Sequence, residues 1–202
     1  MNFDPETNLS QTLRALPARL NDQCRLGDVL LALGDRAAAL ILLVFSIPAI
    51  VPSPGIPAGA IFGSALAFIG LQMTLGRSHL RLPPGFARLR VGRERLERMV
   101  ERFAPHLERI EGRLKAKAVS LAAPQAVRGL GLVVLIMAVL IALPIPFGNT
   151  LPGLAILALA MGLAQRDGLA IAGGLGIALV AGVVSVALIG GSWHLVSRTL
   201  GA

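Results

Sequence analysis

Two apolar runs in the first half of the chain are separated by a short, proline-rich turn. The runs extend from Ala37 to Ile47 and from Ala58 to Gly76. The turn between them holds Pro48, Pro52, Pro54, Gly55 and Pro57. Each proline removes a backbone donor and biases the residue before it away from the α region, so one continuous helix is excluded. At about 1.5 Å per residue, the first run reaches roughly half way through a hydrocarbon core ~30 Å thick. The pattern predicts a broken helical hairpin that turns around inside a membrane.

The same pattern recurs in the second half of the chain. Here the apolar runs extend from Gly129 to Leu143 and from Gly153 to Ala164, both short of the ~20 residues that span a bilayer. The turn holds Pro144, Pro146, Gly148, Asn149 and Pro152. Two copies predict an internal repeat of pseudo-symmetric hairpins, an arrangement that secondary transporters build from discontinuous helices. The alternative is that the prolines only separate ordinary short transmembrane helices.

The segments around the hairpins are amphipathic or uniformly apolar. Leucines at helical spacing between Leu9 and Leu20 predict an amphipathic helix on the membrane surface. Apolar and charged residues also alternate at helical spacing over Gly92 to Leu121, which predicts linker helices divided by Pro105 and packed on the cytoplasmic face. The alternative for this segment is a gate or an anionic-lipid anchor. Leu169 to Ile189 is an uninterrupted apolar run of spanning length. We therefore expect one membrane domain composed of residues 1–34, 35–77, 78–128, 129–168 and 169–192.

Composition and charge place this domain in a membrane. Hydrophobic residues make up 54% of the chain and charged residues 15%, and the mean hydropathy is +0.73, which excludes an ordinary soluble domain. We expect an all-α, multi-pass protein of the bacterial inner membrane. Of the 19 Lys and Arg residues, 13 lie between Arg77 and Arg128, which predicts that this loop is cytoplasmic and that the C-terminus is external. A cytoplasmic membrane loop accounts for the basic charge, so nucleic-acid binding is not expected.

Few residues suggest chemistry. A single cysteine, Cys24, excludes an internal disulfide, and three scattered histidines form no metal motif. No nucleophile motif is present, so the sequence predicts neither an enzyme nor a cofactor. Polar residues beside the hairpins are the candidates for binding a solute, because charges at a hydrocarbon boundary are costly and are paired or functional. They are Asp35, Arg36, Ser53, Gln72, Asn149, Thr150, Gln165, Arg166 and Asp167. The alternative is that the charged ones are interfacial anchors or helix caps.

Small residues recur at four-residue spacing on two of the apolar runs. Gly174, Ala178 and Gly182 form such a face on the last run. Gly59, Gly63 and Ala67 form another in the first hairpin. These faces predict close helix packing within the chain, and they also suit a homodimer.

The hairpins and their flanks resemble the ExoD family of bacterial membrane proteins, named for involvement in exopolysaccharide synthesis. The resemblance covers roughly Leu26 to Leu188. Its most specific parts are Leu33 to Arg36, the first proline turn, Pro144 to Asn149 and Gln165 to Gly168. The resemblance implies an inner-membrane protein. The family name records a phenotype, so no catalytic residue is carried over.

Two functions follow from these patterns. The leading hypothesis is a small transporter with a midplane site between the hairpins. Asp35 and Asp167 would attract a cation at low dielectric, and helix N-termini near the turns would suit a carboxylate. The solute would then be cationic or zwitterionic and amino-acid-like, such as a basic amino acid. The alternative is a membrane accessory protein in exopolysaccharide or envelope synthesis that transports nothing.

Overall fold

The chain is mainly helical, as the sequence predicts. The computed structural model describes residues 10–11, 14–15, 23–34, 37–50, 58–77, 80, 88, 90–92, 94, 97–98, 100–101, 104–105, 108, 124–143 and 148–200. The helices with bounds are α2 (Leu26–Leu33), α3 (Ala37–Ile50), α4 (Ala58–Thr74), α7 (Pro124–Ala142), α8 (Thr150–Gln165) and α9 (Gly168–Leu200). Two short strands, β1 (Gln23–Arg25) and β2 (Arg90–Gly92), accompany them.

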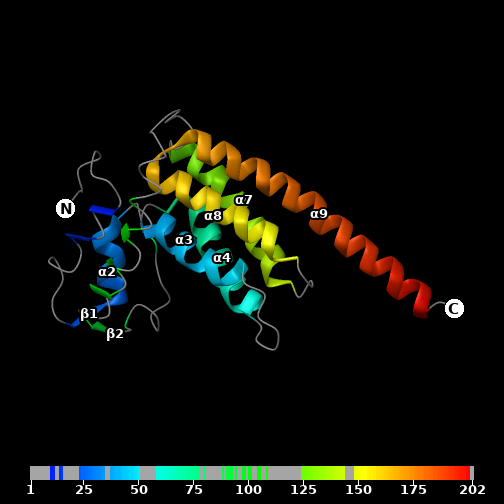
Figure 1. The fold of residues 1–202 in the computed structure, drawn as a ribbon, viewed down its shortest axis with the longest axis horizontal. Coiled ribbons are helices and arrows are strands. Elements are labelled where there is room, and N and C mark those ends of the chain that lie inside the picture. The colour runs from blue at the N-terminus through cyan, green and yellow to red at the C-terminus, as the bar shows by residue number, and fades with distance from the viewer. Residues whose placement is uncertain are drawn as a thin grey trace.

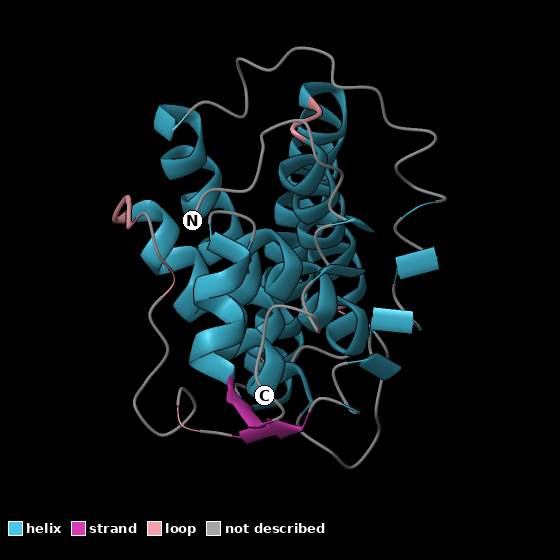
Figure 2. Cartoon of the chain, turned by 90° about the vertical axis from the view of Figure 1, so that its left-hand side faces the viewer, coloured by secondary structure: helices cyan, strands magenta, loops and turns pink. Residues whose placement is uncertain are grey.

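Five of these helices form one bundle (Figure 1). Helix α4 packs on α7, α3 packs on α8 and on α4, and α8 packs on α9. Helix α2 and the two strands lie at the end of the bundle where α3 begins, and α9 continues beyond the opposite end (Figures 1 and 2). Fully buried aliphatic side chains fill the interior: Leu42, Leu66, Ile141, Ile156, Leu159 and Ile171.

Glycines bring α4 and α7 into backbone contact. A Cβ added to Gly63 would lie 2.7 Å from the backbone nitrogen of Ala142, and one added to Gly70 would lie 2.7 Å from that of Leu135. Gly131 approaches α4 in the same way, with 2.5 Å from its added Cβ to the nitrogen of Thr74. Later residues of α4 therefore meet earlier residues of α7, so the two helices are antiparallel. The small residues that the sequence predicts for helix packing serve this contact.

Helices α8 and α9 are packed just as closely. A Cβ on Gly162 would lie 2.7 Å from the backbone nitrogen of Ile171, and one on Gly174 would lie 2.9 Å from that of Leu159. These two contacts fix an antiparallel register. By contrast, Gly182 meets nothing within 4 Å, so only part of the predicted small-residue face of α9 is used within the chain.

Two of the prolines assigned to the hairpin turns lie inside helices. Pro48 belongs to α3, which continues to Ile50, and Pro152 belongs to the first turn of α8. Pro152 costs little there, because the first N–H groups of a helix have no intrahelical acceptor. Pro48 removes one bond near a helix end, where Ala49 is 2% exposed and Ile50 packs on Gly153. Packing therefore extends both helices past the bounds expected from the sequence.

Other bounds also differ from the predicted runs. Helix α7 begins at Pro124, five residues before the expected start at Gly129, and Pro is well suited to a first helical position. Helix α9 runs through the predicted Leu169 to Ile189 and on to Leu200. At about 1.5 Å per residue, its 33 residues extend over ~50 Å.

The N-terminal segment is joined to the middle of the chain. Strand β1 pairs antiparallel with β2, with Cys24 opposite Val91. An ion pair of 2.8 Å links Arg14 Nη2 to Glu108 Oε1. Both connections bridge residues far apart in sequence, and the all-helical prediction did not include this ribbon. Arg14 and strand β1 thus contact the middle of the chain.

One described helix is long and apolar enough to cross a membrane, over Gly168–Gly191. Helices α2 and α3 pass the same test only together, and they are bent by 118° at the break between them. The apolar parts of α4, α7 and α8 are each too short to span a bilayer by themselves. The length and composition of α9 therefore support the predicted membrane class.

The glycine contacts of α4 generate a first prediction. Gly63→Ala places a methyl group against the backbone of α7, so we expect a loss of about 1–3 kcal/mol in the free energy of unfolding. The matched control is Gly176→Ala, where an added Cβ meets nothing within 4 Å and helix propensity favours alanine. Thermal unfolding in detergent measures both variants, and equal stability of the two would contradict the packing described for α4 and α7.

Candidate functional site

Both proline turns lie at the same end of the bundle. A Cβ on Gly59, in the first turn of α4, would run into the side-chain amide of Asn149, which precedes α8. A Cβ on Gly153 would lie 2.5 Å from Cγ1 of Ile50, the last residue of α3. Of the residues assigned to these turns, Pro52, Ser53, Pro54, Gly55, Pro57, Pro144 and Pro146 lie outside the described residues.

Asn149 is the polar side chain that the structure places at this turn end. Its Nδ2 lies against Gly59, while its Oδ1 is buried and accepts no hydrogen bond. Thr150 follows as the first residue of α8 and is half-buried. Asn149 stands at the N-cap position of α8 but makes no side-chain cap bond. Ser53, the candidate in the first proline turn, lies outside the described residues.

Asp167 lies at the opposite end and caps a helix. Its side chain is buried, and Oδ1 accepts hydrogen bonds from the backbone N–H groups of Leu169, at 2.8 Å, and Ala170, at 3.3 Å. These are N–H groups of the first turn of α9, which have no intrahelical acceptor. A carboxylate there also favours the positive end of the helix dipole. Of the two sequence interpretations of Asp167, the geometry corresponds to the helix cap.

Arg166 occupies the turn between α8 and α9. Its backbone is left-handed, with φ of 52°, and it is the only non-glycine residue with positive φ in the described part of the chain. The N–H of Asp167 bonds to the carbonyl of Gly162 at 2.9 Å, which closes the end of α8. The side chain of Arg166 is exposed and makes no hydrogen bond or ion pair with a described residue.

The remaining candidates do not complete one site. Gln72 is buried near the end of α4, Gln165 is the half-buried last residue of α8, and each interacts with another group. Asp35 and Arg36 lie outside the described residues. The 16 residues of α8, about 24 Å of helix, separate Asn149 from Arg166. The described candidates are therefore divided between the two ends of the bundle.

No metal centre is found among the residues that the structure describes, where no three His, Cys, Asp or Glu side chains come together. Of the buried polar side chains there, Ser46 donates to the carbonyl of Leu43 at 2.9 Å, which satisfies its hydroxyl within α3. Ser46 and Asp167, two of the buried polar side chains, thus bond to the backbone.

The sequence analysis missed Arg128 as a candidate. A Cβ on Gly76 would lie 2.8 Å from Cζ of Arg128, so the guanidinium rests on the turn that ends α4. Gly76 has φ of 67°, the conformation that favours glycine after a helix. The sequence signal for this turn is Gly76 followed by Arg77 at the end of an apolar run, but it does not identify Arg128 as the residue that packs there.

The fold and these helix ends define a class of protein: a compact bundle of short apolar helices with one longer helix able to cross a membrane. Residues 9–187 match the family model described as "Exopolysaccharide synthesis, ExoD". The chain belongs to the ExoD family, as the resemblance predicted.

Relatives of the chain are known by sequence. It is 30% identical to Protein ExoD of Rhizobium meliloti over 194 residues, which cover 93% of this chain and 79% of that protein. It is 27% identical to an uncharacterised protein of Synechocystis over 165 residues, covering 81% of this chain and 78% of the other. No solved structure matches the fold.

The cap at Asp167 generates the second prediction. Asp167→Ala removes the acceptor for two N–H groups, and we expect a loss of about 1 kcal/mol in stability. Asp167→Asn keeps a side-chain oxygen at the same position and is the matched control, expected to unfold within a few tenths of a kcal/mol of the parent. Thermal unfolding in detergent decides, and an Asn variant as unstable as the Ala variant would show that the charge, and not the cap, matters.

Proposed function

We propose that the protein is a membrane accessory component of exopolysaccharide synthesis that performs no catalysis and transports no solute. The observation that carries the proposal is the match of the family model to residues 9–187, which include both hairpins and most of α9. The relative from Rhizobium meliloti carries the name of the same family, Protein ExoD. The absence of a nucleophile motif from the sequence supports a role other than an enzyme.

The surface of α9 supports a location within the membrane. Leu179 is 71% exposed, Val183 64% and Val186 69%, on a helix of spanning length. A contiguous apolar surface of this kind is unfavourable in water and favourable in hydrocarbon. The arginine-rich segment from Arg77 to Arg128 connects α4 to α7 at the bundle end away from the proline turns. The positive-inside rule assigns that end to the cytoplasm. On this placement α9 runs outward through the inner membrane, and the protein crosses it or enters it several times.

The register of α8 against α9 supports turns that lie within the bilayer. Gly162 meets Ile171, and Leu159, three residues earlier in α8, meets Gly174, three residues later in α9. Continued to its start, α8 places Thr150 level with Val183. That level is about 22 Å from the first residue of α9, short of a ~30 Å hydrocarbon core. The hairpins would then re-enter from the cytoplasmic side.

The two hairpins further support an internal repeat. Gly63 of α4 packs on α7, and Gly153 of α8 packs on α3. Gly76 and Arg166 hold the same left-handed position after α4 and α8. Gly153 and Arg166 each follow their counterparts, Gly63 and Gly76, by 90 residues. Because both turns lie at one end of the bundle, the repeats would be related by an axis along the bundle and not by inversion.

Transport of an amino-acid-like solute has less support. Its argument rests on a free carboxylate near the midplane, whereas Asp167 accepts two backbone hydrogen bonds at the end of the bundle. Arg166 and Asn149, two candidates for one site, lie about 24 Å apart along α8. The accessory role requires neither a central site nor a free carboxylate.

The accessory role predicts a phenotype that depends on the bundle. We expect deletion of the gene to lower the amount of secreted polysaccharide, and the parent chain to restore it. Gly176→Ala should restore it equally, while Gly63→Leu should not, because leucine cannot fit against the backbone of α7. Polysaccharide is quantified against protein level by immunoblot.

Transport is tested separately with purified protein in liposomes. Uptake of labelled arginine or lysine should equal that of empty liposomes. Accumulation above that level, abolished by Asp167→Asn, would replace the accessory role with the transporter. Unchanged polysaccharide in the deletion strain would contradict the accessory role directly.

The depth of the turns is measurable on α9. In a Cys24→Ser background, Val183→Cys and Gly190→Cys place single thiols on exposed positions, about 10 Å apart along the helix. We expect an impermeant thiol reagent added outside to label position 190 rapidly and position 183 slowly, since the latter lies level with the turn. Equal rapid labelling would indicate that the turns reach the external water and that the hairpins span fully.

A further inference from the structure

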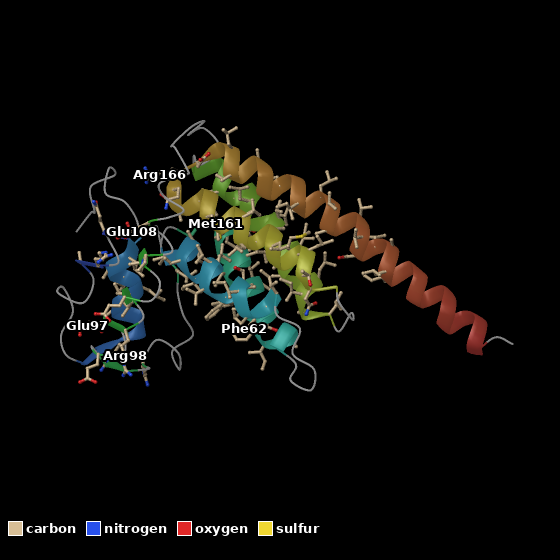
Figure 3. All side chains as sticks on the ribbon, viewed as in Figure 1. Phe62, Glu97, Arg98, Glu108, Met161 and Arg166 are labelled. Carbon is tan, nitrogen blue, oxygen red and sulfur yellow. The ribbon has the colours of Figure 1, made fainter. Side chains whose placement is uncertain are left out.

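The bundle end opposite the proline turns carries three exposed arginines: Arg77, Arg128 and Arg166. Arg77 follows α4, and Arg128 lies in the second turn of α7. Arg166, labelled in Figure 3, joins α8 to α9. None of the three side chains makes an ion pair or hydrogen bond with another described residue. The carboxylate of Asp167, the next residue after Arg166, is buried and accepts a hydrogen bond from a backbone N–H of α9.

Arg128 and Arg77 both lie at the turn that ends α4. The guanidinium of Arg128 occupies the space that a side chain at Gly76 would take, with Cζ and Nη2 both 2.8 Å from the Cβ position. Arg77 is the next residue, and its N–H bonds to the carbonyl of Gln72 at 3.2 Å, which fixes the turn. Both residues therefore add positive charge at the turn that ends α4, which favours an anion there.

Arg166 is retained at a cost. A left-handed conformation costs an L-residue about 1–2 kcal/mol, and glycine avoids this cost at the equivalent position after α4. Arginine at position 166 is therefore not explained by the turn alone. Its exposed side chain adds a positive charge that glycine would lack.

We propose that Arg77, Arg128 and Arg166 bind the phosphate groups of anionic lipids in the cytoplasmic leaflet. This inference rests on the proposed placement of the bundle in the membrane. That leaflet is rich in anionic lipid, and guanidinium groups bind phosphate oxygens in a bidentate manner. The start of α7, close to Arg128, adds the positive end of a helix dipole. The headgroups would hold this end of the bundle at the membrane surface.

The experiment counts anionic phospholipids retained by the purified full-length protein, by native mass spectrometry from mixed phosphatidylglycerol and phosphatidylcholine micelles. Each of Arg77→Gln, Arg128→Gln and Arg166→Gln should weaken retention of phosphatidylglycerol about five-fold, as expected for one basic residue at an anionic surface. The matched control is Arg98→Gln, an exposed arginine of the middle segment that bonds to the carbonyl of Glu94 and should leave retention unchanged.

Arg166→Gly separates binding from folding. Glycine relieves the left-handed strain, so this variant should unfold at the same or a higher temperature while it retains less phosphatidylglycerol. Full retention by Arg166→Gly and by the double variant Arg77→Gln/Arg128→Gln would overturn the proposal. So would displacement of the lipid by millimolar inorganic phosphate, which would identify a free phosphate as the ligand. Neither lipid retention nor thermal unfolding depends on polysaccharide production. Failure of the lipid-binding proposal is therefore distinct from failure of the accessory role.

Discussion

The contact between α4 and α7 is the constraint on which the rest of the bundle depends. Their backbones approach so closely at Gly63, Gly70 and Gly131 that no side chain fits between them. In hydrocarbon, lipid tails are as apolar as leucine, so helices associate through close packing and not through exclusion of water. This contact joins the second helix of one hairpin to the first helix of the other. The pairing of α3 with α8 then brings the remaining two hairpin helices together.

Hydrogen bonds also close the ends of the helices. The carbonyls at the end of α4 and α8 are bonded by the N–H groups of Arg77 and Asp167, so few polar backbone groups remain open. Asp167 then accepts N–H groups of α9, and one residue serves two helix ends. In a membrane, where no water replaces such bonds, this closure is a condition for a short helix to exist at all. The buried Oδ1 of Asn149 is the exception in the described part of the bundle, and it lies at the turn end.

This distribution of polar groups limits the function that the bundle can perform. A transporter needs polar groups that are free to exchange between water and solute, and two of the buried polar side chains described, Ser46 and Asp167, bond to the backbone instead. The unpaired charges of the described bundle lie outside the core, at Arg77, Arg128 and Arg166. Interaction at a membrane surface therefore suits these charges, in agreement with the accessory role that we propose.

The sequence alone determined the helical class, the apolar helices on either side of each proline turn and the family, because long apolar runs and prolines are local properties that need no knowledge of the fold. It did not determine where the helices end. Pro48 and Pro152 read as turn residues, yet contacts such as Ile50 on Gly153 extend α3 and α8 over them. The pairing of β1 with β2 was also hidden, since three-residue strands have no periodicity and their partners are distant in sequence. Nor could the sequence choose between a binding carboxylate and a helix cap at Asp167, because that role depends on which backbone N–H groups the turn brings to its side chain.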